Sequence, residues 1–349
     1  MESNIPVTML KSFALCSLLL LVLSSSIAQV SEVIKFECAD STGFRGLSII
    51  DDKFFWMSGQ HGTVCRSFDG GTSIACMTVP GCEMMDFRSV YGFDQNKVIV
   101  ANIGSPAKMM LTEDKGTTWN EVYSNDHPDA FIDGIDFWND QVGIAYGDPI
   151  DGKMLLLITL DGGKTWKDLP FDSRPNLEPG EASFAASGTA IRCYGDGKVH
   201  IATGGKVSRL FSSDDLGGYW QQKAVPVIQG EPSTGIFSFD FLNDNQWVFV
   251  GGDYNTEAGT TDHIFLTADQ GESWIVPKTP TRGYRECVQF ISETSIIAVG
   301  PNGIDISVDS GINWKPFSDE KGFHVIRKSR VGDLIIIAGQ AGKVLRVKK

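Results

Sequence analysis

The sequence has little that would bind a nucleic acid, a metal or a nucleotide cofactor. Its formal net charge is −13, and it has no long lysine and arginine run of the kind that neutralises a phosphate backbone. Its 5 histidines are scattered, and its cysteines lack the C-x-x-C pairing of a zinc site. Its glycine-rich pieces follow strand-like runs but open no helix. We therefore expect no nucleic-acid partner, no metal and no cofactor.

The chain also has no N-x-Ser/Thr site, so we expect no N-glycosylation. It has no apolar run as long as a membrane-spanning helix. The longest apolar run, Ser12–Leu23, follows Lys11 and precedes a small-residue site that ends at Ala28. A membrane anchor is the alternative, but a spanning helix needs about 20 residues. We predict a signal peptide over residues 1–28, cleaved near Ala28, and a secreted mature chain without a membrane span.

Export to an oxidising compartment would allow disulfides among the cysteines of the mature chain. Cys65 and Cys76 flank one turn and could face each other across a hairpin. Cys193 and Cys287 are either bonded or simply buried as small apolar residues. The six cysteines that follow the predicted signal are Cys38, Cys65, Cys76, Cys82, Cys193 and Cys287.

An internal repeat is the strongest feature of the sequence. Six segments have the form S/T-x-D-x-G-x-x-W, although the first has Ile74 in place of tryptophan. Their aspartates follow one another at intervals of 40 to 54 residues, which is the length of one propeller blade. These aspartates are Asp69, Asp114, Asp161, Asp215, Asp269 and Asp309.

The residue types of the repeat favour a turn that holds itself together. A short aspartate side chain can accept hydrogen bonds from N–H groups of its own turn, and the Ser/Thr hydroxyl adds another. Glycine adopts the positive φ that other residues resist, and tryptophan fills the space between sheets. We therefore assign these aspartates a structural role and not a catalytic one.

Between the repeats, short β-branched and aromatic runs recur in groups of three, as strands do. Six such groups are followed by a seventh at the carboxyl end, HVIRKSR, LIIIAGQ and GKVLRVK, which lacks a fourth strand. The segment Glu32–Glu37 has no blade of its own and can supply that strand. The sequence predicts an all-β, seven-bladed β-propeller, a single domain over residues 29–349 closed by its N-terminal strand.

The repeats are those of Asp-box, or BNR-repeat, proteins, a broad group that includes sialidases and sortilin-type receptors. More closely, the whole mature chain resembles the photosystem II stability/assembly factor-like propellers. The resemblance rests on the seven units, the FRG and FRS starts at Phe44 and Phe87, and the stretch Gly180–Thr189 (GEASFAASGT). It implies a binding scaffold without catalytic activity, and it does not imply that this chain acts on photosystem II.

A binding site is expected at the rim of the channel where the innermost strands begin. The longest irregular segments, Asn125–Phe131, Phe171–Ala182 and Asp253–Asp262, fall on this rim. Alignment of the seven first strands places one residue per blade at the channel mouth. These residues are Arg45, Arg88, Asp133, Thr189, Phe237, Arg285 and His324.

Four of these mouth residues would form a basic arc, because blades 6, 7, 1 and 2 are neighbours in the ring. Guanidinium groups bind carboxylates in bidentate fashion, so the arc fits an acidic protein or an acidic glycan. The alternative is that the arginines pair with nearby acids such as Asp86, Asp133 or Glu286. The predicted ligand-binding residues are Arg45, Arg88, Arg285 and His324.

A second hypothesis makes the same mouth the active site of a sialidase-like glycoside hydrolase. Tyr254 and Glu257 could then act as nucleophile and activating base. Three features weigh against it. The sialidase arginine motif is absent, the ring has seven blades where the sialidase ring has six, and both residues lie in a long loop. We therefore name no catalytic residue and expect a binding scaffold.

Overall fold

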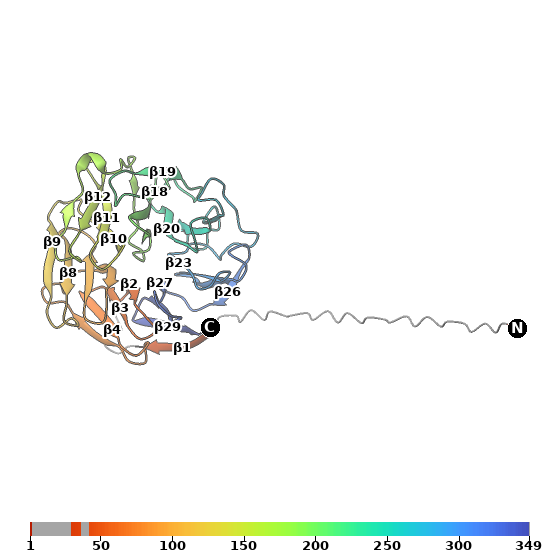
Figure 1. Cartoon of the computed structure of the whole chain (residues 1–349), viewed down its shortest axis with the longest axis horizontal. Coiled ribbons are helices and arrows are strands. Elements are labelled where there is room, and N and C mark those ends of the chain that lie inside the picture. The colour runs from red at the N-terminus through yellow and green to blue at the C-terminus, as the bar shows by residue number, and fades with distance from the viewer. Residues whose placement is uncertain (2–28, 36–41, 349) are drawn as a thin grey trace.

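Short β-branched and aromatic runs form antiparallel strands, grouped in seven sheets that stand around a central axis (Figure 1). The computed structural model describes residues 1, 29–35 and 42–348. Residues 2–28 of the predicted signal peptide and Cys38 therefore lie outside the described residues. The predicted seven-bladed, all-β propeller is confirmed. No described segment forms an α-helix, and none forms a helix that is long and apolar enough to cross a membrane.

The first three blades each consist of four consecutive strands. Blade 1 contains β2 (Phe44–Ile49), β3 (Phe55–Gly59), β4 (Thr63–Ser67) and β5 (Ala75–Thr78). Blade 2 contains β6 (Phe87–Gly92), β7 (Val98–Asn102), β8 (Ala107–Thr112) and β9 (Asn120–Asn125). Blade 3 contains β10 (Ile132–Phe137), β11 (Gly143–Ile150), β12 (Lys153–Thr159) and β13 (Lys167–Asp168).

Blades 3 and 4 are separated by less regular chain, which includes the short 3-10 helix η2 (Phe171–Ser173). Blade 4 contains β15 (Ile191–Tyr194), β16 (Lys198–Ala202), β18 (Arg209–Ser213) and β19 (Gln221–Ala224). Blade 5 contains β20 (Thr234–Phe241), β21 (Trp247–Asp253) and β22 (Ile264–Thr267). Two short strands extend it beyond β20, namely β17 (Gly204–Gly205) and β14 (Glu181–Ala182).

Blades 6 and 7 complete the ring, and blade 7 joins the two ends of the chain. Blade 6 contains β23 (Cys287–Phe290), β24 (Ile296–Gly300), β25 (Gly303–Ser307) and β26 (Trp314–Ser318). Blade 7 contains β27 (Phe323–Lys328), β28 (Ile335–Gly339), β29 (Lys343–Lys348) and β1 (Gln29–Lys35).

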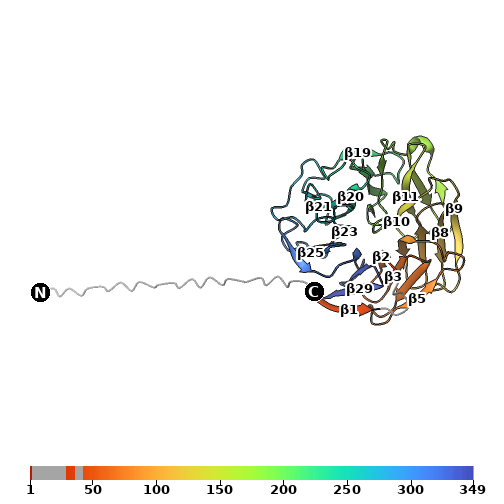
Figure 2. The ribbon, with the colours of Figure 1, turned by 180° about the vertical axis from the view of Figure 1, so that it is seen from behind.

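The ring closes as the sequence predicts, because β1 is the outer strand of blade 7. It pairs antiparallel with β29 from Gln29 opposite Lys348 to Lys35 opposite Lys343. Figure 2 shows the ring from behind, with β1 lying along β29. The strand begins three residues before the predicted segment Glu32–Glu37, and Glu37 lies outside the described residues. Pairing the last strand with the first covers the edge of β29, so no open edge remains there.

The six aspartate turns, defined as the S/T-x-D-x-G segments, contain the hydrogen bonds that the sequence predicts. In each turn, the Ser/Thr hydroxyl donates to an aspartate oxygen at 2.8–3.0 Å and accepts from the glycine N–H at 2.8–2.9 Å. The same aspartate oxygen accepts a backbone N–H four residues later at 2.8–2.9 Å. Hydrogen bonds from Thr118 lower the pKa of Asp114 to about 2.

The aspartate turns join the third strand of a blade to the fourth, or to the chain that replaces it. Because the strands of a blade alternate in direction, these turns lie at the end of the ring where the innermost strands finish. We call this end the turn face. The opposite end, where the innermost strands begin, is the mouth. The two ends of the channel therefore carry different residues, which are described below.

The cysteines settle two of the alternatives left open by the sequence. Cys65 and Cys76 face each other on β4 and β5 and form a disulfide. Cys193 and Cys287 are not bonded to each other, and Cys287 is fully buried. Cys82 is buried and free.

Deletion of residues 29–35 tests the closure of the ring. Loss of the β1–β29 hydrogen bonds, worth about 0.5–1.5 kcal/mol each, should lower the free energy of unfolding by at least about 3 kcal/mol. Chemical denaturation measures this loss. A peptide of residues 29–35, added in excess, should restore stability where a scrambled peptide does not. A truncated chain with the full-length unfolding midpoint would contradict the closure.

A buried histidine in blade 4 should make stability depend on pH. His200 Nε2 lies 2.6 Å from the Tyr194 hydroxyl, and Nδ1 lies 2.7 Å from Ser212 Oγ. Burial lowers the pKa of His200 from its ordinary 6.5 to about 4. In the folded protein the imidazole thus stays neutral at a pH where the unfolded chain takes up a proton.

Unfolding should therefore become easier as the pH falls from 6.5 to 4. We expect this group to contribute a loss of about 3 kcal/mol over that window. Denaturation curves of the wild type and of His200→Gln at pH 7 and pH 4 isolate the contribution of His200 to the free energy of unfolding, because the other groups titrate in both proteins. Equal pH dependence of the two proteins would show that His200 is not buried as a neutral group.

Candidate functional site

The innermost strands of five blades carry a β-bulge next to the mouth, at their second residue in four strands and at the fourth in β20. The strand pairing shifts by one residue between Phe44 and Gly46 in β2, and at the equivalent place in the other four strands. A bulge leaves one residue unpaired and redirects its side chain. The bulged residues are Arg45, Arg88, Asp133, Phe237 and His324, all predicted from the sequence to lie at the mouth.

Blade 6 differs from the prediction by one residue, because Glu286 and not Arg285 occupies the mouth position. In blades 1, 3 and 5 the residue before the bulge pairs with a glycine 15 residues later. The equivalent glycine of blade 6 is Gly300, which assigns Arg285 to the buried position that Phe44 fills in blade 1. A shift of one residue in a strand moves each side chain to the opposite face. This glycine spacing is a sequence signal that could have given the correct register.

Arg285 is accordingly an internal ion-pair partner and does not reach the mouth. Its side chain is 0% exposed, and its guanidinium pairs with Asp305 of β25. Nη1 also donates to the backbone oxygen of Tyr284 at 2.7 Å. A charge in a position filled by Phe or Ile in other blades requires such a partner. Arg285 is therefore removed from the predicted binding residues.

Glu286 connects two of the predicted basic residues. One carboxylate oxygen accepts from Arg45 Nη1 at 2.8 Å and lies 2.7 Å from His324 Nδ1. Burial alone would raise the pKa of Glu286, but the charges and hydrogen bonds of Arg45 and His324 lower it below 4.5. Arg88 pairs with Asp86 at 2.9 Å. The alternative interpretation, in which the arginines pair with nearby acids, thus describes Arg45 and Arg88 in the absence of a ligand.

Pairing does not bury all of these cations. The side chains of Arg45 and Arg88 are 22% and 27% exposed, whereas that of His324 is 11% exposed. Asp133 is fully buried, which raises its pKa well above the ordinary value, and the nearby Asp148 adds to the shift. The two arginines are therefore the basic groups that a ligand at the mouth would meet.

Residues 183–189, within the GEASFAASGT stretch, cross the channel just inside the mouth. They are almost entirely buried and hydrogen-bond to blades 1, 5, 6 and 7. We call them the plug segment. The contacts are Arg45 Nη1–Ala186 O at 2.9 Å, Ser187 Oγ–Glu286 O at 2.9 Å, Thr189 Oγ1–Ser238 Oγ at 2.6 Å and Arg327 Nη2–Gly188 O at 3.4 Å.

An aromatic cluster stands beside the plug segment. Phe184 stacks on Phe237, with ring centroids 3.8 Å apart, and Tyr284 meets Phe237 edge-on at 4.7 Å. Tyr254, from the loop after β21, approaches Phe184 at 6.5 Å and is 47% exposed. The mouth therefore combines partly exposed cations with an accessible aromatic surface. The cations were predictable from the sequence but the cluster was not, because Phe184 and Tyr284 lie outside the inner strands.

Both residues considered for the glycosidase hypothesis, Tyr254 and Glu257, have exposed side chains. Tyr254 lies in the loop between β21 and β22 and packs its ring near Phe184 and Phe237. Glu257 is exposed, and its backbone oxygen accepts the N–H of Tyr284 at 3.0 Å. Among the described residues, no three His, Cys, Asp or Glu side chains gather to hold a metal ion.

Comparison with known proteins gives structural matches only. No protein-family model and no curated protein sequence matches the chain. A structure of YCF48 bound to a D1 peptide has a TM-score of 0.67 at 17% identity, and the match covers 91% of this chain and 94% of that one. YCF48 from Cyanidioschyzon merolae gives 0.63 at 15% identity, covering 91% and 98%. The WD40 propeller of Doa1 gives 0.63 at 13% identity, covering 92% and 97%. The chain thus shares the fold of these propellers.

Substitution of Glu286 tests how the mouth is held together. Glu286→Gln leaves Arg45 and His324 without their shared anion and should lower the free energy of unfolding by about 2 kcal/mol at pH 7. The difference from the wild type should shrink below pH 4.5, where the wild-type carboxylate begins to protonate in the unfolded chain. The matched control is Glu257→Gln, an exposed change expected within about 0.5 kcal/mol of the wild type.

Equal stability of the Glu286→Gln and Glu257→Gln proteins in chemical denaturation would contradict this account. Arg45→Met in the Glu286→Gln background should recover part of the loss, because it removes one of the two unpaired cations. A further loss would instead show that Arg45 is held mainly by Ala186 O.

Proposed function

We propose that the protein is a secreted, non-catalytic scaffold whose mouth binds an acidic segment of a partner protein, in the manner of photosystem II assembly factor-like propellers. The observation that carries the proposal is the combination at the mouth. Arg45 and Arg88 are partly exposed there, beside an aromatic surface formed by Phe184 and Tyr254. Arginine and aromatic side chains are the residues most enriched in the energetically important parts of protein interfaces.

The resting ion pairs are compatible with binding. Arg45 is held by Glu286 through one nitrogen, and Arg88 meets Asp86 through Nε. Each side chain therefore has other N–H groups that can meet a ligand carboxylate. The plug segment holds Arg45 in place through Ala186 O, so little conformational freedom is lost when a ligand binds.

Likeness of fold supports a peptide as the ligand. YCF48, which shares the fold at 17% identity, has been observed with a bound D1 peptide. A propeller of this fold can therefore present a peptide-binding surface. The D1 peptide is the ligand of YCF48, and we do not propose it as the partner of this chain. We further propose that the six aspartate turns are Asp boxes of the BNR type. Export is supported by the predicted signal and by the Cys65–Cys76 disulfide.

The test is selection of short peptides from a displayed library on the purified mature chain, followed by measurement of their affinity by fluorescence anisotropy. Selected peptides should be rich in Asp and Glu. Arg45→Ala and Arg88→Ala should each weaken binding about five- to tenfold and reduce its dependence on salt. The control is Lys164→Ala, which removes one positive charge from the turn face.

Unchanged affinity in the Arg45→Ala/Arg88→Ala double variant, with an unchanged unfolding midpoint, would contradict the proposed site. Preference for acidic oligosaccharides over peptides would retain the site but contradict the protein partner. Turnover of aryl glycosides that is lost in Tyr254→Phe and Glu257→Gln would replace the scaffold with the glycosidase hypothesis.

A further inference from the structure

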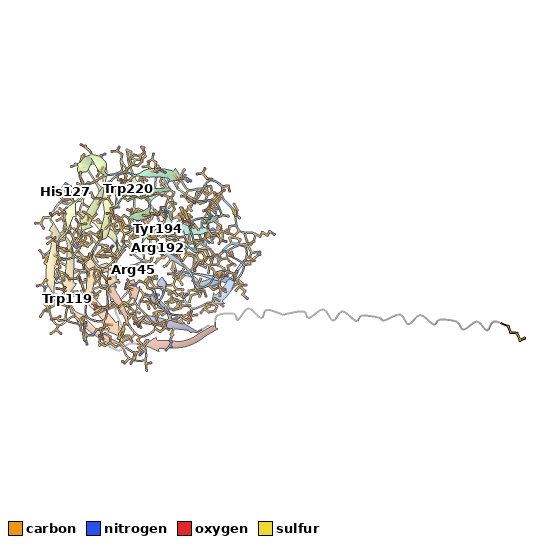
Figure 3. The ribbon with its side chains drawn as sticks, in the orientation of Figure 1. Arg45, Trp119, His127, Arg192, Tyr194 and Trp220 are labelled. Carbon is orange, nitrogen blue, oxygen red and sulfur yellow. A yellow bond between two sulfur atoms is a disulfide. The ribbon has the colours of Figure 1, made fainter. Side chains whose placement is uncertain are left out.

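A cavity of about 340 Å³ opens at the other end of the channel, on the turn face. It is lined by residues near the ends of the innermost strands of blades 1, 2, 3, 4, 6 and 7. We call it the turn-face cavity. Figure 3 shows Arg192, which lines it, close to the middle of the ring, whereas Trp119 and Trp220 lie farther out. The plug segment lies between this cavity and the mouth, because Arg192 and Arg327 both contact its backbone.

Arg192 has one guanidinium nitrogen without a partner. Nε donates to Asp240 at 3.3 Å, and Nη1 donates to the backbone oxygens of Thr189 and Ile191 at 3.1 and 2.9 Å. Nη2 is buried and has no hydrogen-bond partner among the described residues. The whole side chain is 11% exposed. A buried, unpaired N–H of a charged group is costly, and proteins usually satisfy it.

Arg327 is the second cation of the cavity. Its contact with Gly188 O is long, at 3.4 Å. Burial lowers the pKa of Arg327 to about 10, and the positive charge of Arg192 adds to the shift. Both arginines line the same cavity, so their like charges repel each other. An anion between them would remove the repulsion.

Nearby acids only partly balance the positive charge. Asp136 accepts the N–H groups of Phe137 and Cys193 at 2.9 and 2.7 Å, and burial raises its pKa. The oxygens of Asp240 are shared between Arg192 and groups of β23. Arg330 adds a third cation over the ring of Tyr91 at 4.6 Å. Three guanidinium groups thus line the cavity, and the two nearby carboxylates are already hydrogen-bonded.

We propose that the turn-face cavity binds a small oxyanion of the phosphate or sulfate class, held between Arg192 and Arg327. The free Nη2 of Arg192 supplies a donor that the protein leaves unused, and a guanidinium matches the geometry of such an anion. The cavity is large enough to admit either a free ion or the end of a small phosphate ester. This cavity and the mouth are lined by different residues, so the test of anion binding does not depend on the result for peptide binding.

The experiment uses the full mature chain in a buffer without phosphate or sulfate. Inorganic phosphate, sulfate and phenyl phosphate are titrated at constant ionic strength, with binding measured by isothermal titration calorimetry and stability by thermal unfolding. We expect saturable binding with one site per chain and a rise in the unfolding temperature that saturates with it. Binding of phenyl phosphate as tightly as phosphate would identify an ester as a possible ligand, whereas phosphate alone would identify the free ion.

Arg192→Gln and Arg327→Gln should each weaken binding at least tenfold. The control is Lys223→Gln, which removes an exposed cation of blade 4 and should leave binding unchanged. Arg327→Lys keeps the positive charge but loses the paired N–H groups of the guanidinium, so it should bind phosphate with intermediate affinity. This variant also provides a test if the glutamine variants do not fold. A stabilisation by sulfate that never saturates would overturn the proposal, because salts also stabilise proteins by exclusion from the surface. Equal affinity of the Arg327→Lys and wild-type proteins for phosphate would overturn it as well.

Discussion

Pairing of β1 with β29 is the interaction on which the rest of the structure depends. The two strands come from opposite ends of the chain, and their register brings Gln29 opposite Lys348. Closure of blade 7 fixes the positions of β27 and β2 as neighbours. Arg45 and His324 can then share the carboxylate of Glu286, although these residues are far apart in sequence. The mouth is thus assembled by the ring and not by any single blade.

The fold was predictable because its signals are local. Each aspartate turn makes its hydrogen bonds within seven residues, and the same turn recurs six times. The missing fourth strand of the last repeat identified the closing strand. The mouth was predicted less well, because alignment of the first strands by their apolar positions left the register of blade 6 wrong by one residue. Arg285 was assigned to the mouth for this reason, and the glycine spacing that places Glu286 there was overlooked.

Other parts of the site depend on contacts that no local pattern reveals. The plug segment reaches blades 1, 5, 6 and 7 from its place in the chain before blade 4. The turn-face cavity depends on Arg192 of blade 4 and Arg327 of blade 7, which lie in separate strands of ordinary composition. Five of the arginines therefore have three different roles. Arg285 replaces a core residue, Arg45 and Arg88 are accessible at the mouth, and Arg192 and Arg327 face the channel.

Hydrogen–deuterium exchange, with and without a selected acidic peptide, locates the binding surface. We expect the peptide to slow exchange at the mouth, in the plug segment and in the loop of residues 253–262, and to leave exchange in the aspartate turns unchanged. Protection confined to the aspartate turns or to the outer strands would show that the mouth is not the binding surface, whatever the affinity of the peptide.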